Sequence, residues 1–335
     1  MKTRVLITGA TGFVGSHILE QMMQQNELEP VAACRDRSRL LESFNGEIRE
    51  GDLRDHQYLE TLLDDIDIIC HAAAWTSLWG HRQQSDKLYL QPSLALIDLA
   101  IKKGVSRFIN VSTTSANPAM SANPHSPGIQ PNFWPHLCNV VNIENIMKQR
   151  ADEGCQMLNL RLGLFAGERY GLGLLPILLP RLKTHLVPWV KAGKTAMPII
   201  DGEDIGRAFT LACLADQQPD FEAINIIGPS TPAVKDVIEL IHRQYAYPKP
   251  HFNVPFFIAY PFAWLMEKLD PVVPWEPLVT RSIIHLLEDT HATNDKAFRL
   301  LGFKANVTWQ QAIKKQIDTL HEKNLPAMKM AKQII

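Results

Sequence analysis

A glycine-rich segment near the beginning of the chain constrains the fold more than any other feature. Residues 8–15 read TGATGFVG and connect an apolar, strand-like run to a segment with helical spacing. Glycine allows a sharp backbone turn and a close approach of phosphate oxygens, and a helix N-terminus offers free N–H groups and the positive end of its dipole. The segment therefore predicts a dinucleotide phosphate loop rather than a turn built only for packing. The expected contact residues are Gly9, Thr11, Gly12, Phe13, Val14 and Gly15.

Strand-like and helix-like segments alternate through the first half of the chain. Runs rich in Val, Ile and Leu predict strands at residues 4–8, 30–34, 48–50, 67–71, 107–112 and 156–162. Periodic apolar spacing predicts helices at residues 13–25, 56–63, 85–103 and 136–151. This alternation is typical of an α/β fold, a doubly wound parallel sheet of the Rossmann type with helices on both faces.

The second half of the chain has a different texture. Prolines and short apolar runs dominate, with a strand-like run at 223–227 and helical spacing at 233–245 and 309–321. We expect a dinucleotide-binding domain over residues 1–165, to which a segment near 195–230 returns. Residues 166–335 then form mainly a smaller C-terminal substrate region.

One apolar and aromatic run, residues 254–269, stands out in that second region. We interpret it as the wall of an apolar substrate pocket, with plain core or a peripheral lipid contact as the alternatives. The aromatic residues that carry this interpretation are Phe256, Phe257, Tyr260, Phe262 and Trp264.

Composition points to a small-molecule ligand. Lysine and arginine total 34 against 35 aspartates and glutamates, without a block of like charge, so no nucleic-acid partner is expected. The five cysteines show no C-x-x-C spacing, so we expect neither a metal site nor disulfides. No secretion signal is evident, and prolines interrupt the apolar stretch at 172–190; we therefore expect a cytoplasmic protein without an integral membrane segment.

The end of the second predicted strand bears on the choice of cofactor. An NAD-specific fold usually places an acidic residue there for the ribose 2′-hydroxyl, whereas this strand ends Ala-Cys-Arg35-Asp36-Arg37. Arginine forms bidentate, charge-assisted bonds with phosphate, so Arg35 favours NADP. Asp36 leaves NAD open, because a shift of one residue places a carboxylate at the critical position. Solvated arginines without a ligand role are a further alternative.

Several motifs occur together in one order along the chain. After TGATGFVG come GDL at 51–53, HAAA at 71–74, VSTT at 111–114, RLGLFAG at 161–167 and DGEDIGR at 201–207, followed by the tail segment 294–303. In this pattern the chain resembles the extended short-chain dehydrogenase/reductases, which include NAD-dependent epimerases and dehydratases. Within them it is most similar to the 3β-hydroxysteroid dehydrogenase and dihydroflavonol reductase branch, and the resemblance covers nearly the whole chain.

The resemblance implies roles for individual residues. Asp52 accepts a hydrogen bond from the adenine amino group with the Leu53 amide beside it, although Asp52 can instead cap the following helix. Ser112 also lies at the cofactor. The residues that line the adenosine ribose and pyrophosphate are Ala72, Ala73 and Ala74, and those near the nicotinamide are Gly163, Leu164 and Phe165. A homodimer formed through the helices at 85–103 and 136–151 is a further expectation.

The chain departs from the family pattern at the catalytic pair. Family members use a tyrosine and, four residues later, a lysine, with a serine or threonine that orients the substrate oxygen. Thr114 suits the last role. With the helix aligned on Glu144, His136 stands at the tyrosine position and Val140 at the lysine position. His136 is a candidate proton donor, because an imidazole near its usual pKa relays protons; contact with a ligand or a structural role are the alternatives.

Two functions follow from these observations. The first is an NAD(P)-binding oxidoreductase or epimerase/dehydratase-like enzyme that acts on an apolar carbonyl or alcohol, with Thr114 and His136 handling the oxygen and the proton. The second is a non-catalytic nucleotide-binding regulatory or scaffold protein that has lost hydride chemistry.

Overall fold

The computed structural model describes residues 2–116, 133–216, 219–270, 279–286 and 292–322. Its centre is a seven-stranded, wholly parallel sheet in the order β10-β6-β5-β4-β1-β2-β3. The strands are β1 (Thr3–Thr8), β2 (Leu28–Cys34), β3 (Ile48–Glu50), β4 (Ile68–His71), β5 (Arg107–Thr113), β6 (Gln156–Leu162) and β10 (Phe221–Ile226). The order reverses between β1 and β4, and such a switch point is where open α/β sheets bind dinucleotides. The predicted Rossmann fold is confirmed.

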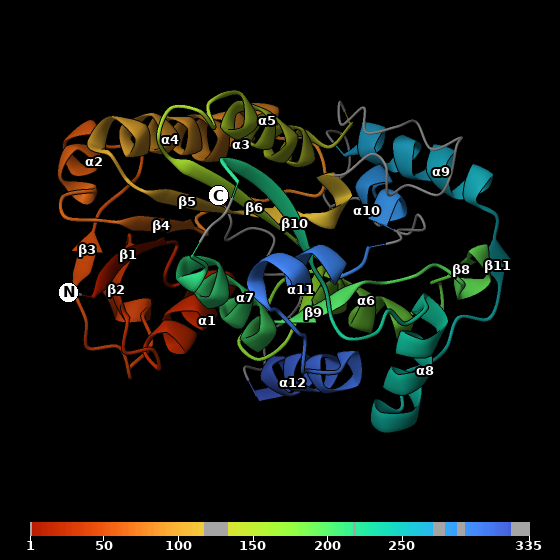
Figure 1. The fold of residues 1–335 in the computed structure, drawn as a ribbon. Coiled ribbons are helices and arrows are strands. Elements are labelled where there is room, and N and C mark those ends of the chain that lie inside the picture. Colours follow the sequence, from red (N-terminus) through yellow and green to blue (C-terminus); the bar gives the residue numbers. More distant parts are fainter. Residues whose placement is uncertain (1, 117–132, 217–218, 271–278, 287–291, 323–335) are drawn as a thin grey trace.

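Helices cover both faces of the sheet (Figure 1). Val5 and Ile7 of β1 belong to the core under α1 (Phe13–Met22), α7 (Gly202–Leu214) and α11 (Asp295–Leu301). The intervening Leu6 belongs to the core on the other face, under α2 (His56–Leu62), α4 (Gln91–Lys103) and α5 (Pro135–Gln149). Alternate residues of a strand point to opposite faces, so a strand covered on both sides is apolar throughout.

One long helical stretch contains an irregular turn. It consists of α3 (Arg82–Ser85), a π-helical turn η2 (Asp86–Leu90) and α4, which ends at Gly104 with φ +73°. Pro92 lacks an N–H and its ring clashes with the carbonyl four residues earlier in a regular α-helix. The wider turn accommodates that proline, and it also holds Tyr89 with its side chain buried.

The remaining elements form a second layer beside the carboxyl end of the sheet. Two small parallel pairs, β7–β9 and β8–β11, lie among helices with a separate core that contains Leu179, Ile199, Ile241 and Ile313. The strands are β7 (Leu164–Ala166), β8 (Trp189–Val190), β9 (Ile199–Asp201) and β11 (Asn253–Val254). The helices are α6 (Leu174–Leu182), α8 (Val234–Tyr245), α9 (Phe256–Leu269), α10 (Arg281–Leu286) and α12 (Trp309–Glu322). Strand β10 belongs to the main sheet and α7 packs on it, although both come after residue 165. A domain border near residue 165 therefore stays a prediction.

The apolar run at 254–269 is a helix, and most of its described aromatic side chains are exposed, so the pocket-wall interpretation stays a prediction. On α9 the side chains of Phe257, Phe262 and Trp264 are 74%, 48% and 46% exposed. Tyr260 turns inward, where its ring lies 6.2 Å from that of Phe133. The side chain of Phe256 lies outside the described residues. Among the described residues, no helix is both long and apolar enough to cross a membrane.

Candidate functional site

The glycine-rich loop has the geometry that its sequence predicts. Gly9 has φ +65°, and a Cβ there would lie 2.8 Å from the backbone of Ala72. A Cβ on Gly15 would lie 2.3 Å from the Gly9 carbonyl oxygen. Helix α1 begins after Gly12 without a side-chain cap, so the N–H groups of its first turn are available to an anion. The residues present therefore fit a dinucleotide pyrophosphate.

A buried hydrogen-bond chain holds the alanine segment against this loop. Thr8 Oγ1 accepts the N–H groups of Ala72 and Ala73, each at 3.2 Å, and therefore donates its own proton to His71 Nδ1 at 2.8 Å. His71 Nε2 then carries the ring hydrogen and donates it to Ser93 Oγ at 3.0 Å. Burial lowers the pKa of His71 to about 4, so the ring is neutral at pH 7. The chain places the backbone of residues 72–73 across the mouth of the phosphate loop.

The adenosine end contains the residues considered for cofactor choice. The Asp36 carboxylate accepts the backbone N–H of Ser38 at 3.0 Å and its hydroxyl at 2.6 Å, so it closes a local turn. Arg35 is exposed and makes no ion pair with any described carboxylate. Its charge helps to lower the pKa of Asp52, to about 2, although the hydrogen bond from the Arg54 side chain contributes most. Asp52 does not cap the following helix, because Asp55 caps α2.

The predicted nicotinamide-side residues contact the phosphate loop through one aromatic cluster. The Phe13 ring lies 5.7 Å from that of Phe165 and 4.5 Å from that of Tyr170. Gly163 leaves no room for a side chain, because a Cβ would lie 1.9 Å from the Pro198 carbonyl oxygen. Leu164 and Phe165 lie in β7, which pairs with β9. The structure thus brings both ends of the predicted cofactor site onto the carboxyl edge of the sheet.

Ser112 has a structural partner. Its hydroxyl donates to Glu144 Oε1 at 2.5 Å, and the same buried carboxylate pairs with Arg161 Nη2 at 2.5 Å. Three elements, β5, α5 and β6, are joined by this contact, which sets the position of α5 over the sheet. Thr114 lies just beyond, buried in the short turn η3 (Thr114–Ala116). It packs on the side of the sheet that α5 covers.

His136 lies in the first turn of α5. Its ring hydrogen-bonds to the backbone of Trp75, while Nδ1 is buried and has no partner among the described residues. Burial lowers the pKa of His136 to about 4, so Nδ1 presents a lone pair at neutral pH. One turn later, Val140 is buried in the apolar core. The expectation of an ordinary imidazole pKa near 6.5 is wrong, because a chain folded around the ring removes the water that stabilises its charged form.

A family model now bears on these observations. The model described as the NAD dependent epimerase/dehydratase family matches residues 5–226. The chain belongs to this family. Its match spans the parallel sheet from β1 to β10, including the glycine-rich loop, His71–Ala74 and His136.

Individual relatives of this epimerase/dehydratase chain are distant. A 4-hydroxy-2-methyl-3-oxo-4-farnesyl-3,4-dihydroquinoline-1-oxide ketoreductase from Stigmatella aurantiaca is 20% identical over 323 residues, which cover 92% of this chain and 94% of the relative. The structure of UDP-glucuronic acid 4-epimerase from Bacillus cereus in complex with NAD has a TM-score of 0.72 at 17% identity, covering 96% of this chain and all of that one, 100%. UDP-glucose 4-epimerase from Thermotoga maritima with UDP-glucose has a TM-score of 0.71 at 19% identity, again over 96% and 100%. At such identities the solved structures show the shared fold.

Sequence reasoning missed the aromatic residues that surround His136. The Tyr89 ring lies 5.1 Å from that of His136, and Trp134 Nε1 donates to the Ser77 carbonyl at 2.7 Å. The ring of His285 lies 6.0 Å from that of Phe133 and 6.3 Å from that of Trp134. The available signal was the Phe133–Trp134 pair directly before the start of the helix that carries His136. Tyr89 therefore lies against His136, and Phe133 and Trp134, just before it in the chain, form an aromatic group with His285.

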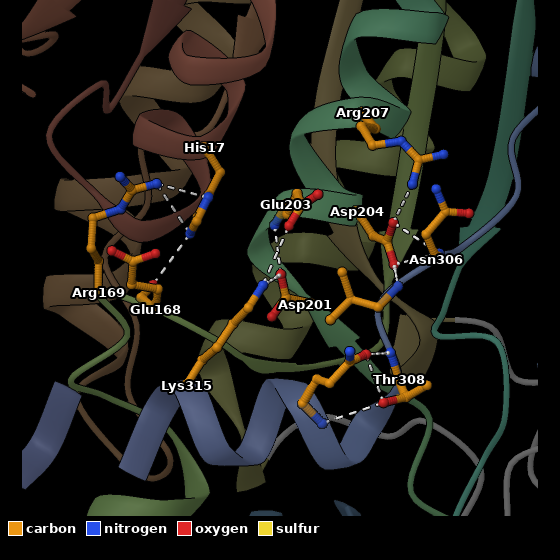
Figure 2. Close-up of polar contacts among 12 residues, drawn as sticks. His17, Glu168, Arg169, Asp201, Glu203, Asp204, Arg207, Asn306, Thr308 and Lys315 are labelled. Atoms are coloured by element: carbon orange, nitrogen blue, oxygen red, sulfur yellow. Dashed lines mark hydrogen bonds and ion pairs between the residues drawn. The ribbon is translucent and has the colours of Figure 1, made fainter. Parts of the chain in front are cut away.

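The DGEDIGR motif, to which the sequence assigned no role, packs against α1, the helix that follows the glycine-rich loop. A Cβ on Gly202 would lie 2.2 Å from the His17 ring, so glycine is needed for α7 to pack closely on α1. Asp204 is buried, accepts the backbone N–H of Val307 at 2.8 Å and pairs with Arg207 at 2.6 Å (Figure 2). The segment before α12 is thereby tied to α7.

A second contact ties α1 to the loop after β7. His17 Nδ1 accepts from Arg169 Nη2 at 2.8 Å, and Nε2 faces the Glu168 carbonyl at 3.2 Å (Figure 2). A guanidinium only donates, so the ring hydrogen is on Nε2. Burial, together with the Arg169 charge, lowers the pKa of His17 to about 4. These contacts make α1 a rigid support for the cofactor loop. No group of three His, Cys, Asp or Glu side chains suited to a metal ion occurs in the described part of the chain.

Proposed function

We propose that the chain is an NADP-dependent oxidoreductase that interconverts an apolar alcohol and its carbonyl compound. The observation that carries the proposal is the buried, unpartnered Nδ1 of His136 among aromatic side chains at the carboxyl edge of the sheet. A buried polar atom without a partner costs free energy, about 1–3 kcal/mol, unless a ligand satisfies it. The hydroxyl group of a substrate is a suitable hydrogen-bond donor for this nitrogen.

The cofactor preference rests on Arg35. Asp36 is occupied by Ser38, whereas Arg35 has no described carboxylate partner and stays near Asp52. A ribose 2′-phosphate suits that guanidinium. The loop residues from Gly9 to Gly15 and the backbone of Ala72–Ala74 would hold the pyrophosphate and adenosine ribose, with Asp52 and Leu53 at the adenine. Gly163–Phe165 would lie near the nicotinamide.

A bound nicotinamide accepts or donates a hydride at the substrate carbon. In the alcohol-oxidising direction Thr114 would orient the substrate hydroxyl and Nδ1 of His136 would take the proton of that hydroxyl, with the nicotinamide as the acceptor of the hydride from the substrate carbon. Carbonyl reduction would reverse both transfers and would need a proton on Nδ1, which a pKa of about 4 makes more available as the pH falls. Because the pKa of His136 is about 4, the base form is present throughout the neutral range. Val140 provides no cation for the ribose, so we expect the phosphate loop and Arg35 to carry more of the cofactor affinity.

The substrate class rests on two further supports. The Tyr89 ring lies beside that of His136, and the rings of Phe133 and Trp134 both lie beside that of His285. Apolar ligand sites are lined mainly by such side chains. The ketoreductase relative from Stigmatella aurantiaca acts, by its name, on a farnesyl-bearing ketone. We extend the proposal to a cytoplasmic location and to a homodimer formed through α4 and α5.

The test begins with parallel titrations of NADPH and NADH against the protein's own tryptophan fluorescence. We expect micromolar NADPH binding that exceeds NADH binding. A screen of apolar ketones follows, with loss of NADPH absorbance as the readout. Turnover of any such ketone supports the proposal.

The alternative is a nucleotide-binding regulatory or scaffold protein without hydride chemistry. The observation that favours it is the buried, apolar Val140 in place of a cation. That protein would bind NADPH and leave it unoxidised by every ketone in the screen. Binding without turnover therefore decides for the alternative, and absence of binding rejects both.

A further inference from the structure

Helix α9 presents an apolar face to solvent. Its inner face is small, because the buried Ala259 and Ala263 pack against Ile284 of α10. Its outer side chains are large and exposed: Phe257 74%, Ile258 50%, Phe262 48%, Trp264 46%, Leu265 47% and Leu269 40%. The helix has 14 residues, which corresponds to a length of about 21 Å.

This apolar face continues beyond the helix. The chain enters α9 directly from β11, which pairs with β8, and the three elements lie along one end of the molecule (Figure 1). Phe252, just before β11, is 47% exposed, and Leu186, just before β8, is 72% exposed. Single exposed apolar residues are ordinary on proteins, whereas a contiguous group of this kind marks an interaction site. We call the outer face of α9 together with Leu186 and Phe252 the α9 surface.

In the chain segments that adjoin the α9 surface, exposed lysines predominate, and Asp270 at the end of the helix accepts a hydrogen bond from Trp79 Nε1. No acidic residue occurs between Glu168 and Asp201, or between Glu239 and Glu267, although the whole chain has a net charge of −1. Lys183, Lys194 and Lys249 are exposed in these stretches, and none of them pairs with a described carboxylate.

The one acidic side chain in the body of α9 is turned away from that surface. Glu267 pairs with Arg281 of α10 at 2.7 Å, and its side chain is only 10% exposed. Its charge is thereby neutralised at the inner side of the helix. The α9 surface is therefore apolar over the helix, with exposed lysines at the helix end and in the segments that lead into β8 and β11.

We propose that the α9 surface docks onto an anionic lipid bilayer, so that the protein lies on the membrane without crossing it. Aromatic and aliphatic side chains on one helix face, with lysines beside them, are the features of an interfacial anchor. Each lysine near an anionic surface strengthens binding about fivefold. A second copy of the chain fits less well, because a two-fold contact brings the same lysines of both copies together. The inference is independent of the reaction and cofactor proposed above.

The experiment is flotation of the purified full-length protein with lipid vesicles. Vesicles of equal parts phosphatidylcholine and phosphatidylglycerol are compared with vesicles of phosphatidylcholine alone. We expect binding to the anionic vesicles that is about 100-fold stronger, because three lysines contribute there. Raising sodium chloride from about 0.1 M to about 1 M shortens the Debye length from about 10 Å to about 3 Å and should weaken the binding.

Two variants separate the apolar and the charged contributions. The double variant Phe262→Ser/Leu265→Ser should lower vesicle binding at least about tenfold, because both side chains lose their burial in the interface. The double variant Lys183→Gln/Lys249→Gln should lower it about 30-fold on anionic vesicles only. Phe298→Ser is the matched control, because Phe298 is 52% exposed on α11, away from this surface. It should bind vesicles like the unchanged protein.

Three results would overturn the proposal. One is no binding to anionic vesicles, and a second is equal loss of binding in the Phe298→Ser control. The third comes from analytical ultracentrifugation without lipid. If the unchanged protein is a dimer and Phe262→Ser/Leu265→Ser is a monomer, the α9 surface is a contact between copies of the chain.

Discussion

The ring of Tyr89 lies 5.1 Å from the ring of His136 at an interplanar angle of 41°. The two residues come from different helices, and the contact depends on the π-helical turn that accommodates Pro92. Burial raises the pKa of the Tyr89 phenol, so the phenol is protonated at neutral pH. His136 is neutral beside it. The pair therefore offers one hydrogen-bond donor and one acceptor in place of a tyrosine and a lysine.

Replacement of His136 tests this chemistry directly. His136→Ala should lower kcat/KM for an apolar alcohol about 100-fold or more, the usual range for loss of a general base. NADPH affinity should stay within about twofold, because the proton acceptor does not hold the cofactor. Steady-state kinetics and a fluorescence titration measure the two quantities. Cys138→Ala, on the same helix, is the control, and unchanged activity in His136→Ala would remove His136 from the mechanism.

Alanine substitution of two glycines with similar φ angles distinguishes loss of cofactor binding from general backbone strain. Gly9→Ala should abolish NADPH binding and destabilise the fold by about 1–3 kcal/mol, since the new Cβ meets the Ala72 backbone at 2.8 Å. Gly104 has φ +73° but has nothing within 4 Å of a built Cβ. Gly104→Ala should therefore cost about 1 kcal/mol and leave binding intact. Equal binding by the two variants would argue against the phosphate-loop role of Gly9.

The 2′-phosphate preference is assigned to Arg35. Arg35→Ala should weaken NADPH binding by about 1.5–3 kcal/mol, the range for a hydrogen bond to a charged group, and leave NADH binding unchanged. Parallel titrations of both cofactors give the ratio. Arg39→Ala is the comparison variant, because Arg39 is also exposed and follows the same strand. A uniform loss for both cofactors in Arg35→Ala would mean that Arg35 does not read the 2′-phosphate.

The buried histidines predict how stability depends on pH. The pKa of His71 is about 4 in the folded protein and about 6.5 in an unfolded chain. Below pH 6.5 the unfolded state binds the proton and the folded state does not, so stability falls between pH 6.5 and 4. The loss is about 3 kcal/mol for each histidine with a shift of this size, and His17 and His136 contribute in the same pH range. Urea unfolding at a series of pH values measures it, and His71→Asn should flatten the slope; an unchanged slope would contradict the buried-neutral state of His71.

Much of the fold and of the cofactor site can be predicted from the sequence, because their signals are local. The glycines from Gly9 to Gly15 carry the requirement for a tight turn in their own backbone. The apolar runs of β1, β4, β5 and β6 indicate strands buried on both faces without any knowledge of what covers them. The C-terminal end of α4 can also be predicted from a single residue, Gly104, because glycine readily adopts the positive φ of a helix end.

The sequence could not predict what each polar side chain contacts. Ser112 and Arg161 are 49 residues apart in sequence yet share Glu144 through parallel strands. The role of DGEDIGR depends on the contact of Gly202 with His17, which lies 185 residues earlier in the sequence.

The sequence by itself determined the parallel sheet, the phosphate loop and the absence of a tyrosine and lysine at residues 136 and 140, because glycine positions and residue identities are local properties. Tertiary structure decided the pKa of His136, the position of Tyr89 and the outward direction of Phe257, Phe262 and Trp264. Each of these depends on what packs around a side chain. Burial changes the solvation of a charge, and packing selects the face of an apolar helix that meets the core.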